Sequence, residues 1–135
     1  MFSSNGKLLA AVVGGDNIIL WDIKTGCRLG KMSGADGPDR ERLDNPDACY
    51  PTEALAFSPD GRYLAVGRDD GSIYLYSLKT FLAVSQIGCS GAEGDRRIGI
   101  VPLRWIAFDA DGRTLYGIGQ NGSNVYAWNV RNVSP

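Results

Sequence analysis

Short apolar runs separated by turn residues recur along this chain. In its middle, the run ALAFS at 54–58 leads into a Ser-Pro-Asp-Gly turn that ends at Gly61. Proline presets φ there, aspartate can bond the backbone ahead, and glycine can adopt positive φ. The runs YLAVG at 63–67 and IYLYSL at 73–78 follow, separated by a second turn, RDDGS. This pattern predicts three short antiparallel strands, with a weaker fourth at 82–87.

The same pattern occurs three times, in copies that begin at Phe2, Leu55 and Ile106. Asn5-Gly6 and Asp111-Gly112 supply the turn chemistry in the outer copies. Self-similarity over some tens of residues is typical of solenoids, propellers and arrays. The aligned positions are Phe2, Phe57 and Phe108; Gly6, Gly61 and Gly112; Leu9, Leu64 and Leu115; and Trp21, Tyr76 and Trp128.

Alternation of apolar and polar residues is poor in LLAAVV (8–13) and in YLAVG, which predicts strands buried on both faces. A repeated four-stranded antiparallel sheet covered on both sides is a propeller blade. We therefore expect an all-β fold, a partial β-propeller of about three four-stranded antiparallel blades, forming one domain over residues 1–135. The expected blade-like units are 1–33, 53–88 and 103–133, joined by long loops at 33–53 and 88–102.

These residues carry a family resemblance. Leu20-Trp21-Asp22 stands where WD-repeat β-propellers close their third strand with a Trp-Asp dipeptide, and FSPDGRYLAVG resembles their first two strands and turn. The copies depart from the pattern at Tyr76-Ser77 and Trp128-Asn129, and no Gly-His dipeptide is present. The resemblance implies a rigid platform for protein–protein interaction that binds a protein or peptide on its loop-rich face.

The two outer copies are predicted to be incomplete blades. The first lacks most of its inner strand, because Met1-Phe2 falls inside it, and the last lacks its outer strand. Three blades do not close a ring, so the outer sheets are expected to expose apolar flanks. Three interpretations remain open: a fragment of a longer propeller, a protomer that completes a ring with other copies, and an open arc docked on a partner.

Candidate contacts for a protein partner follow from the positions of the first strands and of the turns between second and third strands. Trp105, which stands where Ala54 stands in the second copy, suits either a binding anchor or a filler between blades. The predicted binding residues are Glu53, Arg68, Asp69, Arg104, Trp105, Gln120 and Asn121.

Charge and composition narrow the functional classes. A net charge of −1 supplies no basic field for nucleic acid, and no apolar run is long enough to suggest a membrane helix. The three cysteines, Cys27, Cys49 and Cys89, are odd in number and widely spaced, which argues against a disulfide framework or a zinc site. We expect a cytoplasmic protein without metal or cofactor.

Catalysis has little support in the sequence. The chain has no histidine, and therefore lacks the commonest general base and metal ligand. The acidic loop from Asp36 to Asp47 lacks calcium-loop spacing, Asp69-Asp70 is typical of a turn, and Arg96-Arg97 suits a solvated pair or an anion clamp. We predict a non-enzymatic interaction scaffold. The alternative is a part of a propeller-fold enzyme, lactonase-like or quinoprotein-like, whose active site lies outside this chain.

Overall fold

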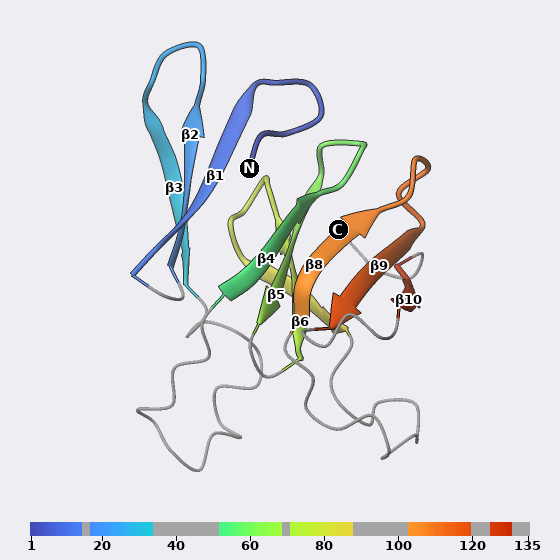
Figure 1. Ribbon diagram of the computed structural model, residues 1–135. Coiled ribbons are helices and arrows are strands. Elements are labelled where there is room, and N and C mark those ends of the chain that lie inside the picture. The colour runs from blue at the N-terminus through green and yellow to red at the C-terminus, as the bar shows by residue number, and fades with distance from the viewer. Residues whose placement is uncertain (15–16, 34–51, 69–70, 88–102, 120–124, 131–135) are drawn as a thin grey trace.

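The computed structural model describes residues 1–14, 17–33, 52–68, 71–87, 103–119 and 125–130. They form three antiparallel sheets that stand side by side, with no helix among the described residues (Figure 1). Blade 1 contains β1 (Leu8–Val13), β2 (Asn17–Asp22) and β3 (Arg28–Ser33); blade 2 contains β4 (Thr52–Phe57), β5 (Tyr63–Arg68), β6 (Ile73–Ser77) and β7 (Ala83–Ile87); blade 3 contains β8 (Leu103–Phe108), β9 (Thr114–Gly119) and β10 (Val125–Asn129). The expected all-β fold of three up-and-down sheets is confirmed.

Blade 1 has only a remnant of an inner strand. Phe2 forms an isolated bridge to Leu9, and Met1 exchanges backbone hydrogen bonds with Ala10, whose N–H donates to the Met1 carbonyl over 2.8 Å. This agrees with the predicted first blade. The expected absence of an outer strand in the last blade lies outside the described residues, which stop at Val130.

The turn between the first two strands of each blade uses the same hydrogen-bonding device. In blade 2, Ser58 Oγ accepts a hydrogen bond from Tyr63 N over 2.9 Å and donates to Asp60 Oδ1 over 2.6 Å. Asp60 Oδ1 also accepts from Arg62 N, and Gly61 adopts a φ of 75°. Such local side-chain bonds favour a turn over a continued strand. Blade 1 repeats the device with Ser3 and Asn5, and blade 3 repeats it with Asp109 and Asp111.

The irregularities of the sheets repeat as well. In the inner strand, the register shifts between Thr52 and Ala54 in β4, and between Leu103 and Trp105 in β8. The pairing of β6 with β7 in blade 2 contains a further register shift, and so does the corresponding pairing of β2 with β3 in blade 1. Because a β-bulge places an extra residue out of the ladder, Glu53 and Arg104 are the bulged residues of their strands. Each irregularity therefore recurs at the equivalent place in two of the three sheets.

The apolar core fills the two spaces between neighbouring blades. Between blades 1 and 2, it contains Ala10, Ile18, Leu20 and Met32 from one side and Phe57, Leu64, Val66, Tyr74 and Tyr76 from the other. Between blades 2 and 3, it contains Ala54, Ala56, Ala65, Ile73 and Leu75 from one side and Leu103, Ile106 and Leu115 from the other. Blade 2 is therefore covered on both faces, and every residue of β6 is buried.

Burial on both faces, expected for LLAAVV, is wrong for β1. Ala10 is buried against blade 2, but Val12 and Val13 are exposed and the other residues of the strand are half-buried. The described residues place no sheet on the far side of blade 1. The equivalent prediction for YLAVG holds, because β5 has blades on both sides.

The blades have two different ends. The compact turns after β4 and β8 lie at one end, the upper one in Figure 1. The opposite end, here called the loop-rich end, contains the start of β4, the end of β5 and their counterparts in blade 3. The longest connections of the chain, 34–51 and 88–102, attach there. Of the predicted binding residues, Glu53, Arg68, Arg104 and Trp105 are described, and their positions in β4, β5 and β8 place their backbone at this end.

Candidate functional site

Two predicted site residues of opposite charge meet at the loop-rich end. Arg104 Nη1 lies 3.7 Å from Glu53 Oε2, and the pair links β8 to the neighbouring β4. Both residues occupy the inner-strand bulges, and a bulge turns a side chain away from the regular alternation of the sheet. The arginine side chain is 55% exposed and the glutamate side chain 29%. Both charges are therefore partly open to solvent at the rim of the inner strands.

Trp105 follows this pair but faces another way. It pairs with Ile118, so its side chain belongs to the same face of blade 3 as Ile118 and Tyr116, the face opposite to blade 2. Its equivalent, Ala54, is buried between blades 2 and 3, whereas Trp105 is 49% exposed. Of the two roles considered for Trp105, its position agrees with contact to a further sheet rather than with the rim of the loop-rich end.

Arg68 is buried rather than presented at the surface. It retains 6% of its exposure, and its guanidinium carbon lies 4.7 Å from the centre of the Tyr74 ring, a cation–π contact. Within the described part of the chain, its Nε and Nη2 have no hydrogen-bond partner, and neither has the buried Thr52 Oγ1 on the adjacent strand. A buried arginine whose N–H groups lack partners pays a desolvation cost. The remaining predicted residues, Asp69, Gln120 and Asn121, lie outside the described part of the chain.

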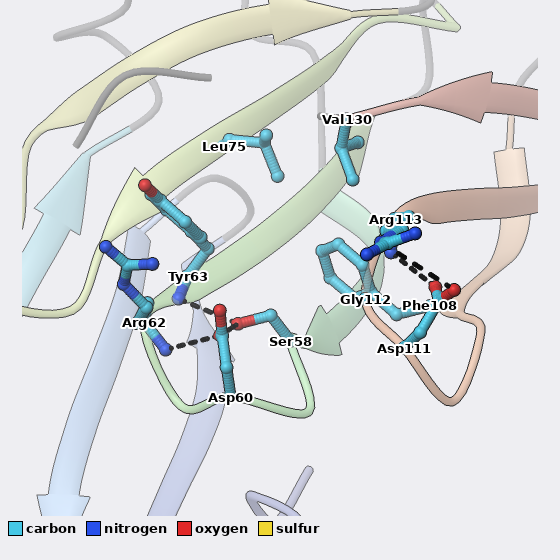
Figure 2. Close-up of a pocket in the computed structure, with 10 residues that line it drawn as sticks. All are labelled: Ser58, Asp60, Arg62, Tyr63, Leu75, Phe108, Asp111, Gly112, Arg113 and Val130. Carbon is cyan, nitrogen blue, oxygen red and sulfur yellow. Dashed lines mark hydrogen bonds and ion pairs between the residues drawn. The ribbon is translucent and has the colours of Figure 1, made fainter. Parts of the chain in front are cut away.

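Sequence analysis did not single out a hollow at the opposite end, between the turns of blades 2 and 3 (Figure 2). It has a volume of about 230 Å³. Leu75, Phe108 and Val130 form its apolar wall, and the turn residues Ser58, Asp60, Arg62, Asp111, Gly112 and Arg113, with Tyr63, form the rest. The tripeptide Asp-Gly-Arg occurs in both turns, at 60–62 and 111–113, and this repetition is the feature of the sequence that could have pointed to the hollow.

The polar groups that line this hollow already form hydrogen bonds within the two turns. Asp60 and Asp111 accept hydrogen bonds from Arg62 N and Arg113 N, at 3.0 and 2.9 Å, and Arg113 Nε lies 4.0 Å from Asp111 Oδ2 (Figure 2). Nearby, the hydrogen bond that Thr114 N donates to Asp109 lowers the pKa of that carboxyl, and the bond from Arg113 N adds to this effect. A carboxylate engaged in a turn makes a poor general base, so this arrangement suits recognition rather than catalysis.

Other functional classes gain little from the described residues. Among them, no group of three or more histidine, cysteine, aspartate or glutamate side chains could hold a metal ion. Cys27 is an exposed free thiol; Cys49, Cys89 and the acidic loop fall in segments that are not described. In the same part of the chain, no helix is long and apolar enough to cross a membrane.

Comparison with known proteins agrees with this geometry. The family model "WD domain, G-beta repeat" matches residues 51–77, which include β4, β5 and β6. A WD repeat-containing protein of Schistosoma mansoni, SL1-17, is 35% identical over 78 residues, which are 58% of this chain and 22% of the relative. The chain thus spans about a fifth of the length of this curated relative.

Solved structures share the fold at low sequence identity. The β-propeller domain of Myceliophteria thermophila Cps50 (Swd1) superposes with a TM-score of 0.70 at 14% identity, over 97% of this chain and 34% of that one. Kuenenia stuttgartiensis hydrazine synthase gives a TM-score of 0.70 at 18% identity, over 98% and 32%. The solved structures show the β-propeller fold, and the repeat match over 51–77 together with the curated relative supports the interpretation of the chain as a partial propeller of the WD-repeat type.

Proposed function

We propose that this chain is a protein–protein interaction scaffold of the WD-repeat type, with its partner site at the loop-rich end around Glu53 and Arg104. The observation that carries the proposal is the ion pair itself. Two equivalent bulges on neighbouring inner strands project opposite charges, 3.7 Å apart and partly exposed. An exposed pair of this kind contributes little to stability, so its charges are available to a polar peptide.

Three further properties support a scaffold. The blades are packed sheets, and a rigid scaffold of this kind holds loops and rim residues in position for recognition. WD-repeat propellers generally mediate protein–protein interactions, and the residues at both ends of this one are mixed in charge. Hydrazine synthase, one of the structural neighbours, is an enzyme, but likeness at 18% identity concerns the fold alone. The proposal includes a cytoplasmic location, which rests on the odd, widely spaced cysteines.

A displayed peptide library tests this function. Panning against the immobilised chain should enrich peptides that lose at least about tenfold in affinity, or 1.4 kcal/mol, when Glu53→Lys or Arg104→Glu is introduced. The swapped variant Glu53→Arg with Arg104→Glu restores a pair inside the chain but reverses each charge as the peptide meets it. It should fold like the parent and still bind poorly.

The control variant is Lys79→Glu, a charge reversal in the turn between β6 and β7, at the other end of the blade. It should leave peptide affinity unchanged. Peptides that bind the swapped variant and the parent equally would place the partner site elsewhere, and the absence of any enriched peptide would contradict the scaffold.

A further inference from the structure

Two apolar sheet faces at the ends of the row of blades are not covered by any of the described residues. The first, the front flank, is the side of blade 1 opposite to blade 2 and consists of Leu9, Ala11, Trp21 and Ile23. The second, the back flank, is the side of blade 3 opposite to blade 2 and consists of Trp105, Tyr116, Val125 and Ala127. Trp105, Tyr116 and Val125 are among the exposed large hydrophobic residues, with Val125 at 66%. Exposed apolar faces of this kind are typical of association sites.

The front face of blades 2 and 3, meaning the side toward the preceding blade, is already covered in the structure. Leu64 in blade 2 and Leu115 in blade 3 occupy the position of Leu9, and both are 0% exposed. Leu64 is covered by blade 1 and Leu115 by blade 2, each time through the opposite, back face of the preceding sheet. Leu9 is half-buried because no described sheet lies against it. The front flank is therefore a third copy of a surface that twice receives the back of another blade.

The back flank repeats the complementary surface. Trp105, Tyr116 and Val125 occupy the positions of Ala54, Ala65 and Ile73, which are buried against blade 3. Two of the three are larger than their counterparts. The front flank offers room for this bulk, since a shallow, open hollow of about 370 Å³ lies over it and Ala11 stands there in place of the larger Val66 of blade 2. A large residue opposite a small one is how packed layers interdigitate.

We propose that the back flank of one copy of this chain packs on the front flank of a second copy, and reciprocally, so that two copies close a ring of six blades. A two-fold rotation about the ring axis closes such a head-to-tail contact without leaving a free face. Six blades lie within the usual range of about four to eight, and three copies would exceed it. This inference concerns the flanks and is independent of the peptide site around Glu53.

The mass of the purified chain in solution tests the ring. Sedimentation or light scattering at micromolar concentration should give twice the 14.5 kDa of one chain. Ala11→Asp on the front flank and Val125→Arg on the back flank should each weaken the dimer at least about tenfold, because every junction of the ring contains both flanks. Leu82→Arg, at a residue that is exposed in the turn after β6, is the matched control and should leave the dimer intact.

Mixing the two variants isolates the head-to-tail arrangement. In a mixed dimer, one junction contains both substitutions, with opposite charges, and the other has two unaltered flanks. The mixture should therefore recover dimer that neither variant forms alone, while circular dichroism shows that each variant retains its strands.

Several outcomes would overturn the proposal. A dimer sensitive to only one of the two variants would indicate pairing between like flanks. A dimer indifferent to both would place the contact elsewhere. A monomer or a polydisperse aggregate would mean that the flanks are covered by blades of another polypeptide, not by a second copy. Loss of peptide binding in an intact dimer would bear on the scaffold alone.

Discussion

Gly30 in β3 lies so close to Phe81 in blade 2 that a Cβ atom at Gly30 would stand 2.9 Å from Phe81 Cδ2. Phe81 holds this position with a φ of 60°, unusual for a residue other than glycine. Its backbone N–H donates to the Ser77 carbonyl over 2.8 Å, which fixes the turn. The Phe81 ring of blade 2 therefore packs directly against the backbone of Gly30 in blade 1.

Gly30→Ala should loosen this contact. The added methyl group has to displace the Phe81 ring, so we expect a loss of about 1–3 kcal/mol in the free energy of unfolding. Denaturant unfolding measures the loss. Combining Gly30→Ala with Phe81→Leu should cost less than the sum of the two single changes, because the smaller side chain leaves room for the methyl group. Additive losses would show that the close approach is not what the alanine disturbs.

Leu75→Ala tests the space between blades 2 and 3. Leu75 is buried on the back face of β6, against the cluster that contains Ile106 and Leu115. The cavity and the lost burial should cost about 2–5 kcal/mol in unfolding free energy. Leu82→Ala, at 62% exposure, should cost almost nothing in the same measurement. Equal losses at the two leucines would contradict the placement of blade 3 against blade 2.

Asp109 should make stability depend on acid pH. Hydrogen bonds that Thr114 N and Arg113 N donate to its carboxylate hold the pKa of Asp109 in the folded chain below its ordinary value. A group with a lowered folded pKa stabilises fully above its unfolded pKa, about 3.9, and that contribution is lost as the pH falls through the folded value. The stability difference between the parent and Asp109→Ser should therefore shrink below about pH 4. This substitution installs the residue that blades 1 and 2 use.

Asp109→Asn provides the control for this pH dependence. Its Oδ1 can still accept both backbone hydrogen bonds, but the side chain does not titrate. The difference between the parent and this variant should also narrow in acid. A difference that stays constant from pH 7 to 3 would exclude Asp109 as its source.

The Glu53–Arg104 pair should matter little for folding. Both side chains are partly exposed and 3.7 Å apart, so a double-mutant cycle with alanine should give a coupling of less than about 1 kcal/mol, reduced further by salt. Thermal unfolding at low and high ionic strength provides the measurement. A larger coupling that salt leaves unchanged would make the pair a structural element rather than a free binding feature.

The strand order, the turns and the all-β fold could be predicted from sequence, because the repeated Gly61-type turn and its flanking apolar runs are local signals. The directions in which the side chains of Glu53, Arg104 and Trp105 point from their sheets could not be predicted in this way. A single bulge in β4 and in β8 shifts the alternation, and the sequence does not mark where the extra residue falls.

The burial of Arg68 is a second feature that could not be predicted from sequence. Its position at the end of β5 suggested exposure, yet its side chain lies over Tyr74 between the blades. Long cationic side chains can bury their stems along apolar surface, and only packing determines whether the head reaches water. The hollow between the two Asp-Gly-Arg turns depends likewise on the spacing of blades 2 and 3, which no single turn encodes.

Amide hydrogen exchange, followed by mass spectrometry, tests most directly the central claim that three blades stand in a row with the middle one covered on both faces. Peptides from β5 and β6 should exchange most slowly, because their strands are central in a sheet buried between two others. Peptides from β1 and β10 should exchange faster. Exchange from β5 and β6 as fast as from these outer strands would contradict the account.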